Sequence, residues 1–324
     1  ACSPDRTAVV ISVSEVREMT GSGGQVVESK SGASKRSIRA VARGADGAGP
    51  REPASLINWI RTVLVLAGVL AIVLSLEVWM RLGILPWYRR GTPSWHRIWN
   101  RVVRVWGVST WNLARIGLGL KVEVEGEIPA AGRYVVIANH QSSIDIPALV
   151  YLLPGLDLKF VAHEGLKYGK PGVSLGLRNG GCAFVHKRNR EEDLEELRRF
   201  ARSTEANQGS PAIFPEGIRS LDGRIRRFQR AGTNAICEVV KLPILPVVHD
   251  GLWRARAIDD LPRLVGTTIR FRFLEPVPAE ALDEDPSAVY ADVQRAIRNG
   301  LADMRGEPIP VRKRARAAHG GAAG

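Results

Sequence analysis

Cysteine is scarce in this chain of 324 residues. The three cysteines, Cys2, Cys182 and Cys237, are odd in number, lie far apart and form no CxxC pair. This pattern gives no sign of a disulfide framework or a zinc site, so we expect a reducing compartment. Aromatic residues make up only 6% of the chain, whereas hydrophobic residues make up 45%. That hydrophobic content is enough for a sizeable core and excludes a wholly disordered or collagen-like protein.

Acidic residues are few relative to basic ones. The chain has 33 Asp and Glu against 46 Lys and Arg, which gives a formal net charge of +13. Such a balance predicts an anionic partner, either nucleic acid, an anionic membrane surface or a phosphorylated substrate. The basic tail at 305–324 has no nucleic-acid-binding motif beside it, so we expect a membrane surface and no nucleic acid. The segment 1–55 is poor in large apolar residues and is predicted to be a disordered tail.

Long uncharged apolar runs are absent, with one exception. The fifteen residues TVLVLAGVLAIVLSL are bounded by Arg61 and Glu77, and alone they are too few to cross a bilayer. The segment 56–81 is long enough if Arg61 and Glu77 extend toward the two interfaces. Trp59 and Trp79 would then lie about 30 Å apart along the helix, which is the separation of the aromatic belts at the two membrane–water interfaces. We predict a membrane-anchoring hydrophobic helix, with a buried helix of a soluble domain as the alternative.

Tryptophan and arginine are concentrated after this run. Seven of the eight tryptophans lie between Trp59 and Trp111, and arginines alternate with them. This mixture predicts an interfacial segment at 82–118. Within it, the spacing of apolar residues predicts a helix over 99–116 that either lies on the membrane surface or packs on the following domain. Arginines follow the run more densely than they precede it, which places that domain on the cytoplasmic side.

Short apolar runs alternate with helical periods from residue 119 to residue 304. This alternation predicts a single α/β domain. The predicted strands are 122–124, 134–138, 158–162, 183–185, 212–214, 244–248 and 268–274, and the predicted helices are 147–153, 191–206, 232–240 and 286–304.

The sequence YVVIANHQSSIDIPAL, at 134–149, places His140 at the end of a predicted strand and Asp145 at the start of a predicted helix. On a continuous helix the two side chains would point about 140° apart, so they can meet only across a non-helical turn. A carboxylate bonded to one imidazole nitrogen fixes the tautomer and leaves the other nitrogen free to accept a proton. The spacing indicates either such a base or a structural histidine, and the residues alone leave both open.

A second strand runs into a polar turn in PAIFPEGIRS, at 211–220. Arg219 could hold a phosphate by two parallel hydrogen bonds. Alternatively, Glu216 and Arg219 could simply pair with each other or cap a helix.

The blocks NHQSSIDIP, GCAFVHKRNR, FPEGIRS and LPILPV, in this order, resemble the four-block signature of the glycerolipid acyltransferase family, typified by 1-acylglycerol-3-phosphate acyltransferases. The resemblance covers about 120–280. It implies a single mixed-sheet α/β acyltransferase domain with helices on both faces, preceded by the membrane-anchoring helix. It also implies that His140 is the general base and that Asp145 orients it.

The resemblance further implies that the second and third blocks bind the acceptor's phosphate. Lys187 stands where the family has Arg, and Arg188 could substitute for it. Glu216, Gly217 and Arg219 match the third block, and Ile218 replaces the commoner Thr. In the fourth block, Pro243 and Pro246 match a segment thought to shape the acyl or acceptor pocket, although a structural turn is an equal alternative.

The implied reaction transfers a fatty acyl group from acyl-CoA or acyl carrier protein to the sn-2 hydroxyl of 1-acylglycerol-3-phosphate. No cofactor and no metal are expected. The departures at Lys187 and Ile218 leave another lyso-lipid, such as lyso-ornithine lipid, as an alternative acceptor. Two other classes stay open. One is a non-catalytic membrane lipid-binding scaffold; the other is a hydrolase using the GxSxG sequence around Ser174, although no apolar strand precedes it.

Overall fold

A seven-stranded mixed sheet forms the centre of the molecule in the computed structural model, which describes residues 54–186, 188–220, 222–255 and 258–309. The strand order is β1-β7-β6-β2-β5-β3-β4. All neighbouring strands run parallel except β6 and β7. The strands are β1 (Lys121–Glu125), β2 (Val135–Ala138), β3 (Leu158–His163), β4 (Ala183–Val185), β5 (Ser210–Ile213), β6 (Ile244–Asp250) and β7 (Thr268–Phe273).

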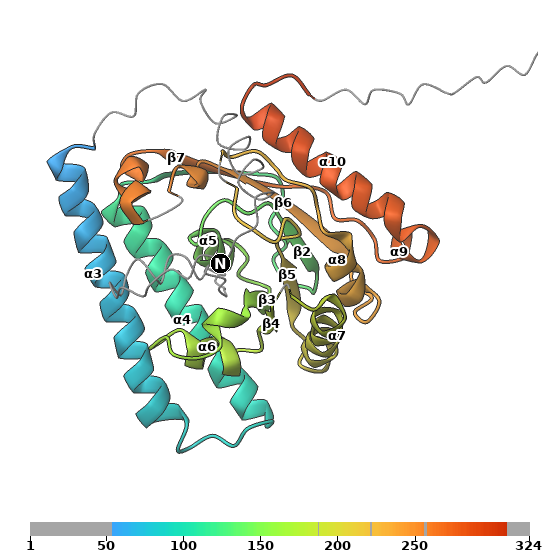
Figure 1. Cartoon of the computed structure of the whole chain (residues 1–324), viewed down its shortest axis with the longest axis horizontal. Coiled ribbons are helices and arrows are strands. Elements are labelled where there is room, and N and C mark those ends of the chain that lie inside the picture. The colour runs from blue at the N-terminus through green and yellow to red at the C-terminus, as the bar shows by residue number, and fades with distance from the viewer. Residues whose placement is uncertain (1–53, 187, 221, 256–257, 310–324) are drawn as a thin grey trace, which may run out of the picture.

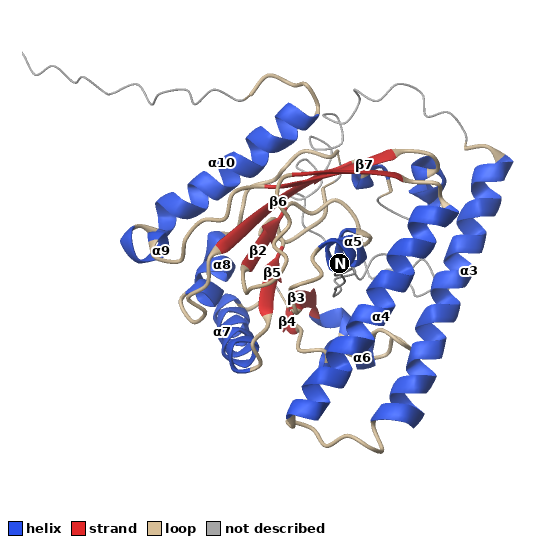
Figure 2. Ribbon diagram, turned by 180° about the vertical axis from the view of Figure 1, so that it is seen from behind, coloured by secondary structure: helices blue, strands red, loops and turns tan. Residues whose placement is uncertain are grey.

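Helices cover both faces of this sheet (Figure 1, Figure 2). Strand β2 shows why: Val136 and Ala138 belong to one core cluster, and Val135 and Ile137 to the other. Because successive side chains of a strand point to opposite faces, an all-apolar strand is buried on both sides. The main helices are α3 (Leu56–Val78), α4 (Pro93–Gly117), α5 (Asp145–Leu152), α6 (Ser174–Asn179), α7 (Arg190–Ala206), α8 (Arg230–Cys237), α9 (Ala281–Glu284) and α10 (Pro286–Met304).

The α/β prediction is therefore confirmed, with all seven strands within two residues of the predicted bounds. Helix α6 was not predicted, because its six residues give too short an apolar period to detect. Of the two predicted tails, 1–53 and 310–324 lie outside the described residues.

Helices α3 and α4 form an antiparallel pair beside the domain (Figure 1). The pair is close because glycines face apolar side chains across it. A Cβ on Gly68 would lie 2.6 Å from Leu113 Cδ2, and one on Gly117 would lie 2.3 Å from Val65 Cγ2. Each helix begins at a hydroxyl cap, Ser55 for α3 and Thr92 for α4.

The inner face of α3 contacts protein rather than solvent. Arg61 Nε donates to the Gly117 carbonyl oxygen at 2.9 Å, and Glu77 Oε2 accepts from the Gly172 N–H at 2.7 Å. Both side chains thus have partners within the protein, and their extension toward two membrane interfaces stays a prediction. Helix α4 likewise buries Trp99 and Trp111 against the domain, so of its two predicted placements the structure has the packed one.

The outer face of α3 is apolar and exposed. Its exposed side chains include Leu56, Ile57, Ile60, Val63, Leu64, Leu70, Leu74 and Val78. Within the described part of the chain, the helix that continues from Leu56 to Ile84 is the one segment long and apolar enough to cross a membrane, with a mean hydropathy of 2.5. It is a candidate membrane anchor.

Candidate active site

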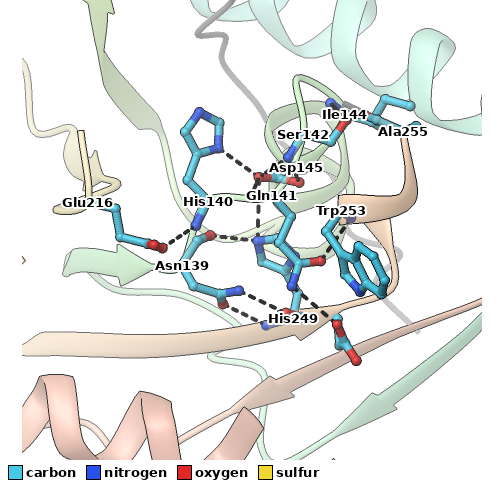
Figure 3. A network of polar contacts seen from close by, with 11 residues as sticks. Asn139, His140, Gln141, Ser142, Ile144, Asp145, Glu216, His249, Trp253 and Ala255 are labelled. Atoms are coloured by element: carbon cyan, nitrogen blue, oxygen red, sulfur yellow. Dashed lines mark hydrogen bonds and ion pairs between the residues drawn. The ribbon is translucent and has the colours of Figure 1, made fainter. Parts of the chain in front are cut away.

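The His140 and Asp145 side chains meet at the carboxyl end of β2. His140 Nδ1 lies 2.7 Å from Asp145 Oδ2 (Figure 3). The five-residue spacing permits this because residues 139–142 are neither helix nor strand, 143–144 form a turn, and α5 begins at Asp145 itself. The other ring nitrogen of His140, Nε2, points away from Asp145 (Figure 3).

The Asp145 carboxylate is fully buried, and it is fixed by backbone donors. It accepts the N–H of Gln141 at 2.6 Å and that of Ser142 at 2.9 Å to Oδ2 and 3.0 Å to Oδ1. Burial opposes its ionisation. Electrostatic interaction with the His249 and His140 rings, together with these hydrogen bonds, outweighs burial and holds the pKa of Asp145 below its usual range. Asp145 is therefore an anion at neutral pH.

A second histidine lies behind the pair. His249 of β6 is fully buried, with Nε2 2.6 Å from the Asn139 carbonyl oxygen and 3.6 Å from Asp145 Oδ2. The Asn139 side-chain amide in turn donates to the His249 carbonyl and accepts from the His249 N–H, both at 2.9 Å. These bonds tie the end of β2 to β6 and support the turn that carries His140.

Glu216 holds the turn after β5 against the same site. Its Oε1 accepts the His140 N–H at 2.8 Å, and its Oε2 accepts the Arg226 N–H at 2.7 Å. Burial raises the pKa of Glu216 to about 7, against the opposing effect of these two donors. The next residue, Gly217, has a φ of 68°, a left-handed conformation that favours glycine.

The environment of His140 keeps its ring neutral. The ring stacks on Phe214, with centroids 4.3 Å apart and an interplanar angle of 21°. Burial lowers the pKa of His140, and the hydrogen bond and charge of Asp145 counter this only in part. At neutral pH the imidazole is therefore predominantly in the form that can accept a proton.

His140 lines a cleft of about 1270 Å³ at the carboxyl ends of the parallel strands. The lining includes apolar side chains, among them Val161, Leu194, Leu197, Ile213 and Ile236. It also includes one acidic residue, Asp193, and six basic ones, Arg188, Arg190, Arg219, Arg226, Arg227 and Arg230. A base beside apolar side chains and a set of cations suits a substrate that has both an apolar chain and a phosphate.

Comparisons with known proteins point to acyltransferases. The sequence model of the family described as Acyltransferase matches residues 120–250. The 1-acyl-sn-glycerol-3-phosphate acyltransferase alpha of Homo sapiens is 28% identical over 176 residues, which are 54% of this chain and 61% of that protein. The 1-acyl-sn-glycerol-3-phosphate acyltransferase of Cocos nucifera is 26% identical over 249 residues, 74% of this chain and 76% of that protein.

Residues 120–250 of this chain are therefore similar to the acyltransferase family.

A solved structure shares the fold. The crystal structure of the 1-acyl-sn-glycerophosphate acyltransferase PlsC from Thermotoga maritima aligns with a TM-score of 0.58 at 21% identity, over 77% of this chain and 97% of that chain. Among the curated relatives, the matches to the human and bovine proteins span about 61% and 60% of their own length.

The structure brings several of the predicted residues of the acyltransferase together. His140, Arg188, Gly217 and Arg219 line the cleft, and Asp145 lies directly behind His140. Lys187 lies outside the described residues.

Three predicted residues lie elsewhere. Glu216 does not line the cleft, and both of its oxygens accept backbone N–H groups, so its predicted contact with the acceptor does not fit its position. Pro243 precedes β6 at the opposite end of the sheet, where its carbonyl accepts the Val135 N–H. Pro246 is a strand residue that lines a smaller cavity beside α10. Neither proline reaches the cleft, because the fourth block forms the body of a strand rather than its carboxyl end.

His249 and the arginines at 226, 227 and 230 were not among the predicted site residues. His249 lies more than one hundred positions after Asp145, so no local spacing could have joined them. The three arginines lie in the run RIRRFQR at 224–230, but no motif pointed to it.

Ser174 of the GxSxG sequence has a structural role. Its hydroxyl donates to the Leu166 carbonyl at 2.9 Å and accepts the Lys170 N–H at 3.0 Å. It begins α6 and does not line the cleft. Within the described ranges, no group of three or more His, Cys, Asp or Glu side chains is arranged to hold a metal ion.

Proposed function

We propose that this chain transfers a fatty acyl group from an acyl thioester to the free sn-2 hydroxyl of 1-acylglycerol-3-phosphate, which gives phosphatidic acid. One observation carries the proposal: a neutral His140, backed by a buried Asp145 anion, opens into a cleft that is lined by apolar side chains and arginines. The names of the relatives support the choice of acceptor.

In the proposed reaction, His140 Nε2 takes the proton from the acceptor's hydroxyl as the oxygen attacks the thioester carbonyl. Asp145 keeps the other proton on Nδ1 and stabilises the imidazolium that forms. The tetrahedral intermediate then collapses, the carbon–sulfur bond breaks, and the thiolate leaves and takes the proton from His140. No acyl-enzyme forms, because the hydroxyl attacks the thioester directly.

Arg188 and Arg219 are proposed to bind the acceptor's phosphate, since both line the cleft that contains His140. A guanidinium matches a phosphate with two parallel hydrogen bonds. The part of Lys187 in this contact stays a prediction. The apolar side chains of the lining would accommodate an acyl chain, and holding both substrates near His140 supplies much of the rate gain.

The exposed apolar face of α3 is proposed to enter the membrane that contains the lipid substrate. Because its opposite face packs on α4 and the domain, the cleft would stay beside that membrane. The density of arginines after the helix favours the cytoplasmic side.

A different lyso-lipid, such as lyso-ornithine lipid or another lysophospholipid, is a second candidate acceptor. It is favoured by Ile218, which lines the cleft with an exposed apolar side chain where relatives of the family more often have a hydroxyl.

The test measures thiol release from oleoyl-CoA by membranes that contain the full chain or its His140→Ala variant. 1-Acylglycerol-3-phosphate and then other lyso-lipids are supplied as acceptors. We expect release that needs both His140 and 1-acylglycerol-3-phosphate. If release needs His140 but a different lyso-lipid, the reaction stands and that lyso-lipid is the acceptor. If no thiol is released with either oleoyl-CoA or acyl carrier protein as donor, the non-catalytic lipid-binding scaffold is favoured.

A further inference from the structure

Five arginines of the cleft form no ion pair with a carboxylate in the described part of the chain, although the charge of Arg226 acts on Glu216. Among the described residues, no hydrogen-bond or ion-pair partner is found for the side chains of Arg188, Arg190, Arg226, Arg227 or Arg230.

Most arginines elsewhere in the described chain are paired. Arg133, for example, donates to both oxygens of Glu205, and Arg305 donates to both oxygens of Asp250. Unpaired guanidinium groups are therefore commoner in this cleft than in the rest of the described chain, where Arg224 is one of the exceptions.

Three of these arginines come from one segment that is fixed beside the base. The Arg226 N–H donates to Glu216 Oε2 at 2.7 Å, and the Gln229 N–H donates to the Pro215 carbonyl at 2.7 Å. Glu216 also accepts the His140 N–H, so one carboxylate joins this segment to the backbone of His140. Helix α8 then begins at Arg230. This attachment holds all three side chains on the wall of the cleft that contains His140.

The number of cations exceeds what one phosphate monoester needs. Arg188 and Arg219 already suffice for two contacts to the acceptor's phosphate, which leaves Arg190 and the three arginines of one segment, Arg226, Arg227 and Arg230, without a ligand. Cations gathered in a concave site repel each other and concentrate anions. The one acidic residue that lines the cleft, Asp193, balances at most one of them, so the cleft can hold a second anionic group.

The acyl donor can supply that group. Acyl-CoA carries a diphosphate and a further phosphate on its ribose, whereas the prosthetic arm of acyl carrier protein carries a single phosphodiester. Three guanidinium groups suit the several phosphates of the first donor better than the single charge of the second.

We propose that Arg226, Arg227 and Arg230 form a subsite for the phosphates of the CoA nucleotide, and that acyl-CoA is therefore the donor. This inference rests on the proposed acyltransferase function. It adds a role for three residues and a choice of donor.

The test compares two donors with the same thioester. Oleoyl-CoA has the nucleotide phosphates, and oleoyl-N-acetylcysteamine has none. The full-length chain in membranes is assayed as wild type, as the double variant Arg227→Gln, Arg230→Gln, and as the control Arg224→Gln. Arg224 is exposed on the same segment but does not line the cleft. The quantity measured is the ratio of kcat/KM for oleoyl-CoA to that for the truncated donor.

We expect the double variant to lower this ratio about tenfold or more, as loss of two charge-assisted phosphate contacts should, and Arg224→Gln to leave it as in the wild type. Inhibition by adenosine 3′,5′-bisphosphate should weaken in the double variant by a similar factor. An active double variant with an unaltered ratio would overturn the subsite and leave the acyltransferase function intact. So would a wild type that accepts acyl carrier protein but not oleoyl-CoA. Absence of thiol release from every donor in the wild type would instead refute the function itself.

Discussion

The imidazole of His140 and the carboxylate of Asp145 are joined by a 2.7 Å contact across a turn whose backbone N–H groups also bind that carboxylate. The backbone of the turn thus holds the Asp145 carboxylate in place, and the carboxylate orients the His140 ring. The arrangement sets the ring's Nδ1–H tautomer and leaves Nε2 as the proton acceptor.

Replacing His140 by Ala should lower kcat by two or more orders of magnitude, because the proton acceptor is lost. Folding should be little affected, since the bond to Glu216 uses the His140 backbone N–H, which alanine retains. The check is thiol release together with thermal unfolding in the same detergent. Near-normal turnover in a folded variant would exclude His140 as the base.

Asp145→Asn should lower activity by about 10²- to 10⁴-fold, because an amide directed at Nδ1 favours the opposite tautomer.

In the wild type, activity requires neutral His140. Its lowered pKa means that the acid limb of the pH–rate profile should fall below the ordinary histidine value of 6.5. Removal of the Asp145 anion should move that limb to still lower pH, since the carboxylate favours the protonated ring. Profiles of kcat/KM for both proteins test this, and a limb that shifts upward would contradict it.

The raised pKa of Glu216 predicts a pH dependence of stability. Its folded value of about 7 exceeds the ordinary 4.5, so between these values the folded state binds more protons than the unfolded state. Stability should therefore fall as pH rises through this window, by about 3 kcal/mol in total. Glu216→Gln should remove this component, although its amide can no longer accept both N–H groups.

Denaturant unfolding at several pH values between 4.5 and 8 measures the component as wild type minus variant. The exposed substitution Glu195→Gln on α7 is the control. Equal slopes for wild type and Glu216→Gln would show that the carboxyl group is not buried as described.

Much of this fold could be predicted from local pattern, because all-apolar strands and amphipathic helices such as α7 and α10 can be recognised from the spacing of apolar residues close together in the sequence. The His140–Asp145 contact was also foreseeable, since both residues lie on one turn. The positions of Glu216 and His249 were not. Which way Glu216 points depends on the Arg226 backbone ten residues later, and His249 reaches Asp145 only through the pairing of β6 with β2.

Arg219→Ala should raise the acceptor's apparent KM about tenfold or more while KM for the donor changes little, because the lost contact is to the acceptor's phosphate. Arg219→Lys should recover part of the loss, since the charge is kept but the planar fork is not. A phosphate-free acceptor such as monoacylglycerol serves as the comparison, and its KM should be the same for wild type and variant. If the substitution raised KM equally for both acceptors, Arg219 would not be a phosphate-binding residue.

The exposed face of α3 should mediate membrane attachment. Leu64 and Leu70 lie on it, 66% and 52% exposed, so replacing both by Glu changes no packing contact of the inner face. A charged side chain in hydrocarbon costs about 2.5–3.5 kcal/mol on insertion scales, so the double variant should lose most of its binding to vesicles that contain anionic lipid. Flotation measures this, with Ser287→Glu, Ala288→Glu at the exposed start of α10 as a charge-matched control. If both variants float equally, the attachment lies elsewhere. If only the α3 variant stays in the soluble fraction yet still releases thiol with substrate in detergent, the helix serves to bring the cleft to its lipid substrate rather than to build the site.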